Sequence, residues 1–79
     1  MKIGIIGAGR LGICFALLCE RAGYDVVVSD IRQDYVNDLQ NKKIVTNEPG
    51  VQELLGVAEN LRATTSNEEV IRECDIIYT

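Results

Sequence analysis

Short apolar runs alternate with longer amphipathic stretches along the first thirty residues. An apolar run at residues 3–6 ends in a glycine-rich hexapeptide at 7–12, and a mostly apolar stretch with helical spacing follows. The next run, at 26–28, consists of three valines, which is typical of a strand buried on both faces of a parallel sheet. The pattern predicts a strand, a glycine turn, a helix over 11–22 and a second strand that closes at Asp30.

The alternation continues through the middle of the chain. Apolar residues keep helical spacing at 31–40, which predicts a second, half-exposed helix. Residues 41–50 resemble a loop, because they end in a Pro-Gly pair. Helical spacing returns at 51–58, and a short third strand is expected at 61–65.

A helix-start signal follows the third predicted strand. Ser66 and Glu69 match the capping box, in which a serine hydroxyl and a glutamate three residues later satisfy free amides at a helix start. We expect a helix from about Asn67 to about Cys74, and then a fourth strand from Ile76.

Strands that alternate with helices imply an α/β fold with a parallel sheet. Right-handed crossovers give the strand order 3-2-1-4, the first half of a doubly wound Rossmann fold. Because the fourth strand has only begun where the sequence ends, we expect residues 1–79 to be the N-terminal part of a larger Rossmann domain. A chain of 79 residues is marginally stable by itself.

Composition excludes several classes of function. The net charge of −4 and the lack of a basic cluster argue against nucleic acid or an anionic membrane surface as a partner. The longest apolar stretch, at 11–19, is too short to span a bilayer, and the pattern of a secretory signal peptide is missing from the first residues. We therefore expect a cytoplasmic protein.

The cysteines offer neither a metal site nor an evident nucleophile. Three cysteines without CxxC spacing and without histidine make metal binding improbable. On a helix, Cys14 and Cys19 would lie roughly 8.5 Å apart, beyond disulfide reach. We interpret both as small buried hydrophobic residues with reduced thiols, and acidic residues such as Glu48 form no evident pair. No catalytic residue is predicted.

The glycine hexapeptide has the context of a dinucleotide-binding turn. It follows a predicted strand and opens a helix. An acidic residue, Asp30, ends the next predicted strand, 18 positions after Gly12. Gly7 would permit the tight turn, Gly9 would let a pyrophosphate approach the backbone, and Gly12 would let the helix pack close to the strand. The free amides at the helix start would then bind the phosphates.

Asp30 favours NAD over NADP, because a carboxylate accepts hydrogen bonds from a ribose 2′-hydroxyl and repels a 2′-phosphate. The glycine pattern alone does not exclude FAD. Arg32 could contact the adenine or soften the exclusion of NADP, and it could equally be a solvated residue in the first turn of a helix. Arg10 could approach the pyrophosphate or point to solvent.

Three segments resemble the UDP-glucose/GDP-mannose dehydrogenase family. The opening residues 1–12, MKIGIIGAGRLG, are similar to the family's MKIxxIGxGxVG start. Residues 48–55, EPGVQELL, resemble its more selective EPGLxELL segment, and residues 61–65 match its LRATT strand. The resemblance covers essentially all of the chain.

The resemblance implies an NAD-dependent oxidoreductase that converts the C6 hydroxyl of a nucleotide sugar to a carboxylate in two hydride transfers, through a thiohemiacetal on a cysteine. That cysteine lies later in the family's sequence, so the 79 residues alone are expected to be inactive and to meet the nucleotide sugar only through the rest of the protein. The cofactor residues that carry over are Gly7, Gly9, Gly12 and Asp30, with the Arg10 and Leu11 backbone as neighbours. Tyr35 stands where the family often has a basic residue.

Two alternatives stay open at this point. The chain could belong to another NAD enzyme, of the hydroxyacyl-CoA or 6-phosphogluconate dehydrogenase type, or it could be a nucleotide-binding module without catalysis. We expect the isolated chain to be a homo-oligomer, because the helix at 11–22 is apolar almost all round and the strand at 76–79 would leave a sheet edge unpaired.

Overall fold

The computed structural model describes residues 1–7, 9–42 and 50–78, which form an α/β fold. The elements follow one another as β1 (Lys2–Ile6), α1 (Arg10–Arg21), β2 (Asp25–Ser29), α2 (Gln33–Gln40), α3 (Val51–Val57), β3 (Leu61–Thr64), α4 (Asn67–Glu73) and β4 (Ile76–Tyr78). The strands form a parallel sheet in the order β3-β2-β1-β4. The predicted fold class and strand order are confirmed.

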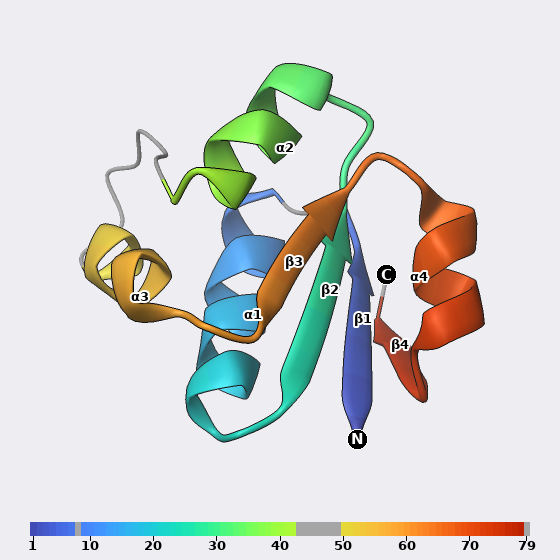
Figure 1. The fold of residues 1–79 in the computed structure, drawn as a ribbon, viewed down its shortest axis with the longest axis horizontal. Helices are drawn as coiled ribbons and strands as arrows, with labels where there is room; N and C mark the ends of the chain where they lie inside the picture. Colours follow the sequence, from blue (N-terminus) through green and yellow to red (C-terminus); the bar gives the residue numbers. More distant parts are fainter. Residues whose placement is uncertain (8, 43–49, 79) are drawn as a thin grey trace.

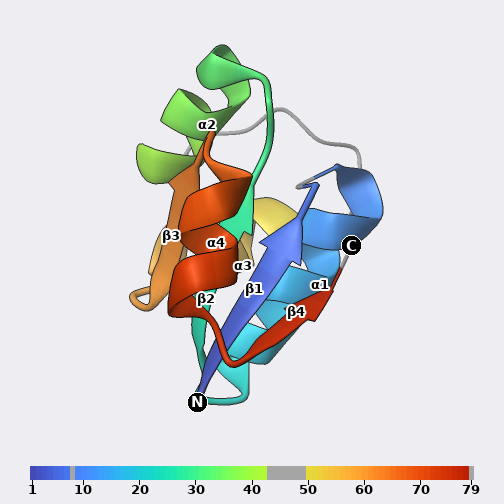
Figure 2. The same cartoon turned by 90° about the vertical axis from the view of Figure 1, so that its right-hand side faces the viewer.

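The helices divide between the two faces of the sheet (Figure 1). α1, α2 and α3 lie on one face, and α4 lies on the other, where Figure 2 shows it in front of β2 and beside β1. Both faces are therefore covered along β1 and β2, as their near-continuous apolar sequences predict.

The main core lies between the sheet and α1, α2 and α3. The strand register places Ile5 beside Val28, and Val28 beside Ala63, on this face. α1 packs Ile13 and Leu17 against them, and each of these five side chains is at most 6% exposed. Burial of this apolar surface is the main force that fixes α1 to the strands.

The packing of α4 on the sheet depends on a close contact with Gly4, which the sequence pattern does not single out. A Cβ at Gly4 would lie 2.5 Å from Val70 Cγ1 and 2.9 Å from Cys74 Sγ. Val70 is fully buried, so it has little room to move away. Gly4 therefore lets α4 approach the central strand, a role that any side chain would obstruct.

The predicted helix at 31–40 begins later than expected. α2 starts at Gln33, with Arg32 as its N-cap in an extended conformation. Ile31, which the helical spacing counted as an apolar helix position, lies outside the helix and is 87% exposed. The Asp30 carboxylate accepts a hydrogen bond from the Arg32 backbone amide and so stabilises a turn where the pattern predicted helix.

The other boundaries agree with the prediction to within one residue, apart from the loop. The Pro-Gly loop at 41–50, with Glu48, falls mostly on residues 43–49, which lie outside the described residues. Near its start, Lys42 adopts a left-handed conformation with φ of 61°.

The predicted capping box is half formed. The Ser66 hydroxyl accepts a hydrogen bond from the Glu69 amide at 3.1 Å, as predicted. The reciprocal bond is replaced, because the Ser66 amide donates to Thr64 Oγ1 and the Glu69 carboxylate accepts from Arg62 on β3. A second bond, from Arg62 to Glu73, extends this link between β3 and α4.

The start of β1 is fastened to the start of β4. The Lys2 amide donates to Asp75 Oδ2 at 2.9 Å, and the Asp75 amide donates to the Lys2 carbonyl at 2.8 Å. This reciprocal pair joins residues that are 73 positions apart in sequence.

One face of α1 remains uncovered. Leu11, Phe15 and Leu18 follow helical spacing and are 84%, 40% and 58% exposed. On β4, Ile76 and Tyr78 are also exposed. Within the described residues, every helix is too short or too polar to cross a membrane.

Candidate cofactor-binding site

The glycine turn lies where β1 leaves the sheet. Gly7 has a φ of +94°, which L side chains rarely adopt, and its amide donates to the Ser29 carbonyl at 2.8 Å. The chain then enters α1, whose N-cap is Gly9. Because the register pairs Ile6 with Ser29, Gly7 and Asp30 leave the sheet side by side. The two predicted parts of the site are thus brought together.

Each glycine of the turn has a different physical reason. Gly7 needs its positive φ. A Cβ at Gly12 would lie 2.2 Å from the Gly7 carbonyl oxygen, so Gly12 permits close packing of helix against strand. Gly9 has an ordinary φ of −69°, and a Cβ there would meet nothing within 4 Å. The fold therefore does not need a glycine at position 9, whereas a ligand that approaches the backbone there would.

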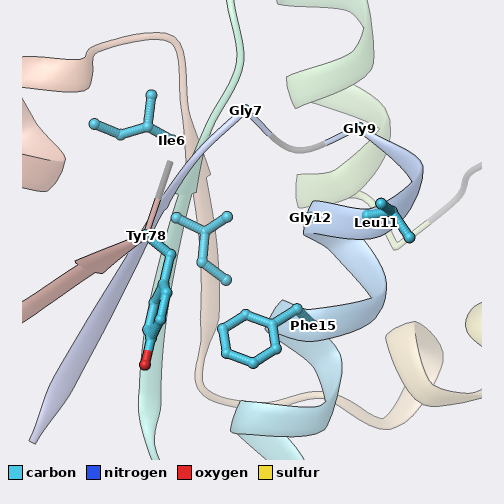
Figure 3. A pocket seen from close by; sticks show the side chains of 8 residues that line it. Ile6, Gly7, Gly9, Leu11, Gly12, Phe15 and Tyr78 are labelled. Carbon is cyan, nitrogen blue, oxygen red and sulfur yellow. The ribbon is translucent and has the colours of Figure 1, made fainter.

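A cavity of about 710 Å³ opens beside the turn (Figure 3). Its walls are mainly apolar, and Figure 3 shows the rings of Phe15 and Tyr78 side by side below the turn. Their centroids lie 4.9 Å apart in an edge-to-face arrangement. The lining residues are Ile5, Ile6, Gly7, Gly9, Leu11, Gly12, Phe15 and Tyr78.

The Asp30 carboxylate is held by its neighbour Arg32. Arg32 Nε donates to Asp30 Oδ1 at 2.8 Å, and Arg32 Nη2 donates to Asp30 Oδ2 at 3.0 Å. The Asp30 side chain is 9% exposed and that of Arg32 is 58% exposed, so the guanidinium covers the carboxylate. The hydrogen bond to Asp30 raises the pKa of Arg32.

Tyr35 completes this arrangement from α2. The Arg32 guanidinium carbon lies 4.3 Å from the centre of the Tyr35 ring, within the range of a cation–π contact. Sequence reasoning treated Asp30, Arg32 and Tyr35 separately and missed that they form one cluster. The spacing of two and five residues at a strand-to-helix turn is the signal that could have suggested it.

Two further residues stabilise the strand end that carries Asp30. Ser29 is fully buried, and its hydroxyl is hydrogen-bonded to Asn67 Oδ1 at 2.5 Å. The Asp30 amide donates to the Thr64 carbonyl at 3.1 Å. The start of α4 thus supports the edge of the sheet where β2 ends, a contact that the sequence pattern did not predict.

The other predicted site residues lie at the start of α1. Arg10 opens the helix, and its side chain lies outside the described part of the structure. Leu11 follows it and forms one wall of the cavity. Helix geometry leaves the backbone amides of residues 10–12 without intrahelical partners. These amides are therefore available to an anion.

The cysteines lack the features of catalytic thiols. Cys19 is buried and Cys14 packs against the core. Burial raises the pKa of Cys19 and of Cys74, which disfavours the reactive thiolate. Among the described residues, no group of three or more histidine, cysteine, aspartate or glutamate side chains could hold a metal ion.

Comparison with known proteins identifies relatives along the whole chain. The family model described as "UDP-glucose/GDP-mannose dehydrogenase family, NAD binding domain" matches residues 1–79. A GDP-mannose 6-dehydrogenase from Pseudomonas syringae pv. tomato is 41% identical over 80 residues, which cover 96% of this chain and 18% of that protein. The chain thus spans about a fifth of the length of this relative.

Solved structures give the same result. A ternary complex of GDP-mannose dehydrogenase from Pseudomonas aeruginosa matches with a TM-score of 0.91 and 25% identity, over 98% of this chain and 18% of that one. A UDP-glucose dehydrogenase from the archaeon Pyrobaculum islandicum matches with a TM-score of 0.90 and 28% identity, over 96% and 18% of the two chains.

These matches confirm the resemblance seen in the sequence and favour it over the hydroxyacyl-CoA and 6-phosphogluconate alternatives. They also confirm NAD as the cofactor of this kind of domain. Since residues 1–79 match the NAD binding domain throughout, the chain belongs to the UDP-glucose/GDP-mannose dehydrogenase family.

Proposed function

We propose that the chain binds NAD across the carboxyl edge of its sheet, with the pyrophosphate on the glycine turn and the adenosine ribose at Asp30. The observation that carries this proposal is Gly9. Its backbone conformation suits any residue and its Cβ direction is open, so the glycine serves neither the turn nor the packing. A ligand that must touch the backbone at this point explains it.

The start of α1 suits an anion. The amides of residues 10–12 point out of the first turn, and the aligned peptide dipoles add partial positive charge there. The first turn of α1 carries no acidic residue that would oppose a phosphate. We infer that the backbone of Gly9, Arg10 and Leu11 contacts the pyrophosphate, because these residues follow the turn directly.

Asp30 is the group that we assign to the ribose hydroxyls. Asp30 already accepts three hydrogen bonds from Arg32, from its backbone amide, Nε and Nη2. We infer that the ribose hydroxyls compete with Arg32 for the carboxylate oxygens when NAD binds. Two negative groups would meet if a 2′-phosphate entered instead. The arrangement therefore favours NAD over NADP.

For the whole protein we propose NAD-dependent oxidation of a nucleotide sugar. The relatives named above act in this class, as dehydrogenases of GDP-mannose or UDP-glucose. The chain spans 18% of their length, and we infer that the sugar site and the catalytic groups lie in further parts of such a protein. Residues 1–79 would then be the N-terminal part of its NAD-binding domain.

We also propose a cytoplasmic homo-oligomer. The free cysteines Cys14, Cys19 and Cys74 suit a reducing compartment. The exposed apolar residues of α1 and β4 favour association with a second copy.

Titration of NAD and NADP into the protein in its natural length, at one ionic strength, tests the cofactor assignment. NAD should bind more tightly, and Asp30→Ala should weaken NAD binding, because the diol loses its acceptor. Equal affinity for both cofactors in the wild type, or unchanged NAD binding in the variant, would remove Asp30 from this role. Reduction of NAD in the presence of UDP-glucose or GDP-mannose tests the substrate class.

A further inference from the structure

We propose that Arg32 is a latent binding residue for a nucleotide 2′-phosphate, and that Asp30 suppresses it by occupying its guanidinium. The preference for NAD then depends on the Asp30–Arg32 pair and not on the carboxylate alone. This inference rests on the proposed binding of NAD at the carboxyl edge of the sheet.

The first observation is the geometry of the pair. Arg32 uses Nε and Nη2 to bind both oxygens of Asp30, at 2.8 Å and 3.0 Å. This side of the guanidinium is the planar fork that fits a carboxylate and a phosphate equally well. The Asp30 carboxylate therefore occupies the fork. A phosphate would have to displace this carboxylate and would be repelled by its negative charge.

The second observation is that Arg32 has a support that does not depend on Asp30. Its guanidinium lies over the Tyr35 ring, 4.3 Å from the ring centre, and Tyr35 is half-buried on α2. An aromatic ring holds the plane of an arginine by cation–π attraction. If the charge of Asp30 is removed, Tyr35 should therefore keep the fork at the same strand end.

The third observation is the position of the pair relative to the nucleotide. Asp30 follows the last residue of β2, beside Gly7, which is where the adenosine ribose reaches in the proposed complex. The Arg32 side chain is 58% exposed, so a ligand can approach it from solvent. In the proposed complex, the Asp30 carboxylate oxygens accept hydrogen bonds from the ribose hydroxyls of NAD. A 2′-phosphate on that ribose would occupy the same place.

The test is a double-mutant cycle on the protein in its natural length, with NAD and NADP affinities measured by calorimetry. Asp30→Asn removes the charge and keeps the shape, and Asp30→Ser removes the charge with a smaller side chain. We expect either change to raise the affinity for NADP roughly ten- to hundred-fold, the size expected for a new charge-assisted hydrogen bond. Adding Arg32→Ala to either variant should abolish this gain.

Arg32→Ala in the wild-type background should not raise NADP affinity, because the charge of Asp30 remains and loses its paired guanidinium. Arg21→Ala, which removes an equal charge at the far end of α1, serves as the control for general electrostatics. Circular dichroism of each variant shows that it is folded.

The outcomes separate the inference from the function on which it rests. A wild-type protein that binds neither cofactor refutes the proposed function itself. If the wild type binds NAD but the Asp30 variants gain nothing for NADP, the latent site does not exist. A gain that survives Arg32→Ala would come from relief of repulsion alone and would equally refute the role of Arg32.

Discussion

Gly9 and Gly12, at the start of α1, separate the requirements of the fold from those of the ligand. The same substitution, glycine to alanine, should affect stability at position 12 and NAD binding at position 9. In Gly12→Ala the new methyl group would lie 2.2 Å from the Gly7 carbonyl oxygen. To reach even 3.0 Å, helix and turn must separate by about 0.8 Å. Overpacking against backbone of this kind costs about 2–3 kcal/mol, which is roughly 10 °C or more in the unfolding midpoint of a small domain.

Gly9→Ala should leave stability within about 1 kcal/mol of the wild type. Alanine reduces the freedom of the unfolded chain, which stabilises, and is a poorer N-cap than glycine, which destabilises by a similar amount. The methyl group would nevertheless stand where we place the pyrophosphate. NAD affinity should therefore fall about tenfold or more, and Gly9→Val should weaken binding further.

Urea unfolding followed by circular dichroism gives the stability of both variants, and calorimetry with NAD gives the affinity. The expected pattern is a folded Gly9→Ala protein with weak NAD binding and a destabilised Gly12→Ala protein. If Gly9→Ala binds NAD like the wild type, the pyrophosphate does not approach this residue. If it unfolds as easily as Gly12→Ala, the glycine at position 9 serves the fold and the proposal loses its main support.

Three further predictions concern stability and assembly. Gly4→Ala should destabilise the chain by about 1–3 kcal/mol in urea unfolding, because its methyl group would meet Val70 at 2.5 Å. The control Gly56→Ala, which has open space around it in α3, should stabilise the chain by about 0.5–1 kcal/mol. Equal effects of the two substitutions would contradict the tight contact with α4. Hydrogen bonding to Arg62 lowers the pKa of Glu69 below its ordinary 4.5, so the stabilisation that Glu69 adds is present above pH 4.5 and is lost as the pH falls through the lowered pKa. Glu69→Gln should therefore be less stable than wild type at pH 7 and equal to it in strong acid, and a similar pH-dependent loss in the control Glu68→Gln, from the same helix turn, would show that the helix start and not Arg62 is responsible. The 79-residue chain should sediment as a dimer or larger assembly at micromolar concentration, and Leu18→Ser, on the exposed face of α1, should shift it toward monomer; a wild-type chain that is already a dispersed monomer would contradict this.

Local patterns were sufficient for the fold and for part of the site. The apolar runs predicted β1 and β2, because a strand buried on both faces must be apolar along its length. The positive φ of Gly7 and the close packing of Gly12 followed from the context of the turn. In each case the information lies within about ten residues of sequence, where spacing and residue type are decisive.

The features that were missed depend on residues that are distant in sequence or on competition between partners. Gly4 is needed because Val70 packs on it, and no pattern near residue 4 shows this. The capping box is half formed because Arg62, on a neighbouring strand, binds the Glu69 carboxylate. Ile31 fits a helical period, yet the Asp30 side chain stabilises a turn there.

The fastening of Lys2 to Asp75 has a consequence for the order in which the chain folds as it is synthesised. β1 is central in the sheet, but one of its two partner strands is made 73 residues later. At ~5–20 residues per second, this separation corresponds to about 4–15 s of translation. During that time β1 can pair with β2 across α1, a unit of local connections, while the edge for β4 and the surface around Gly4 stay open. The pairing of β1 with β4 is therefore a late step, and this edge of β1 stays open in the nascent chain until Tyr78 has been synthesised.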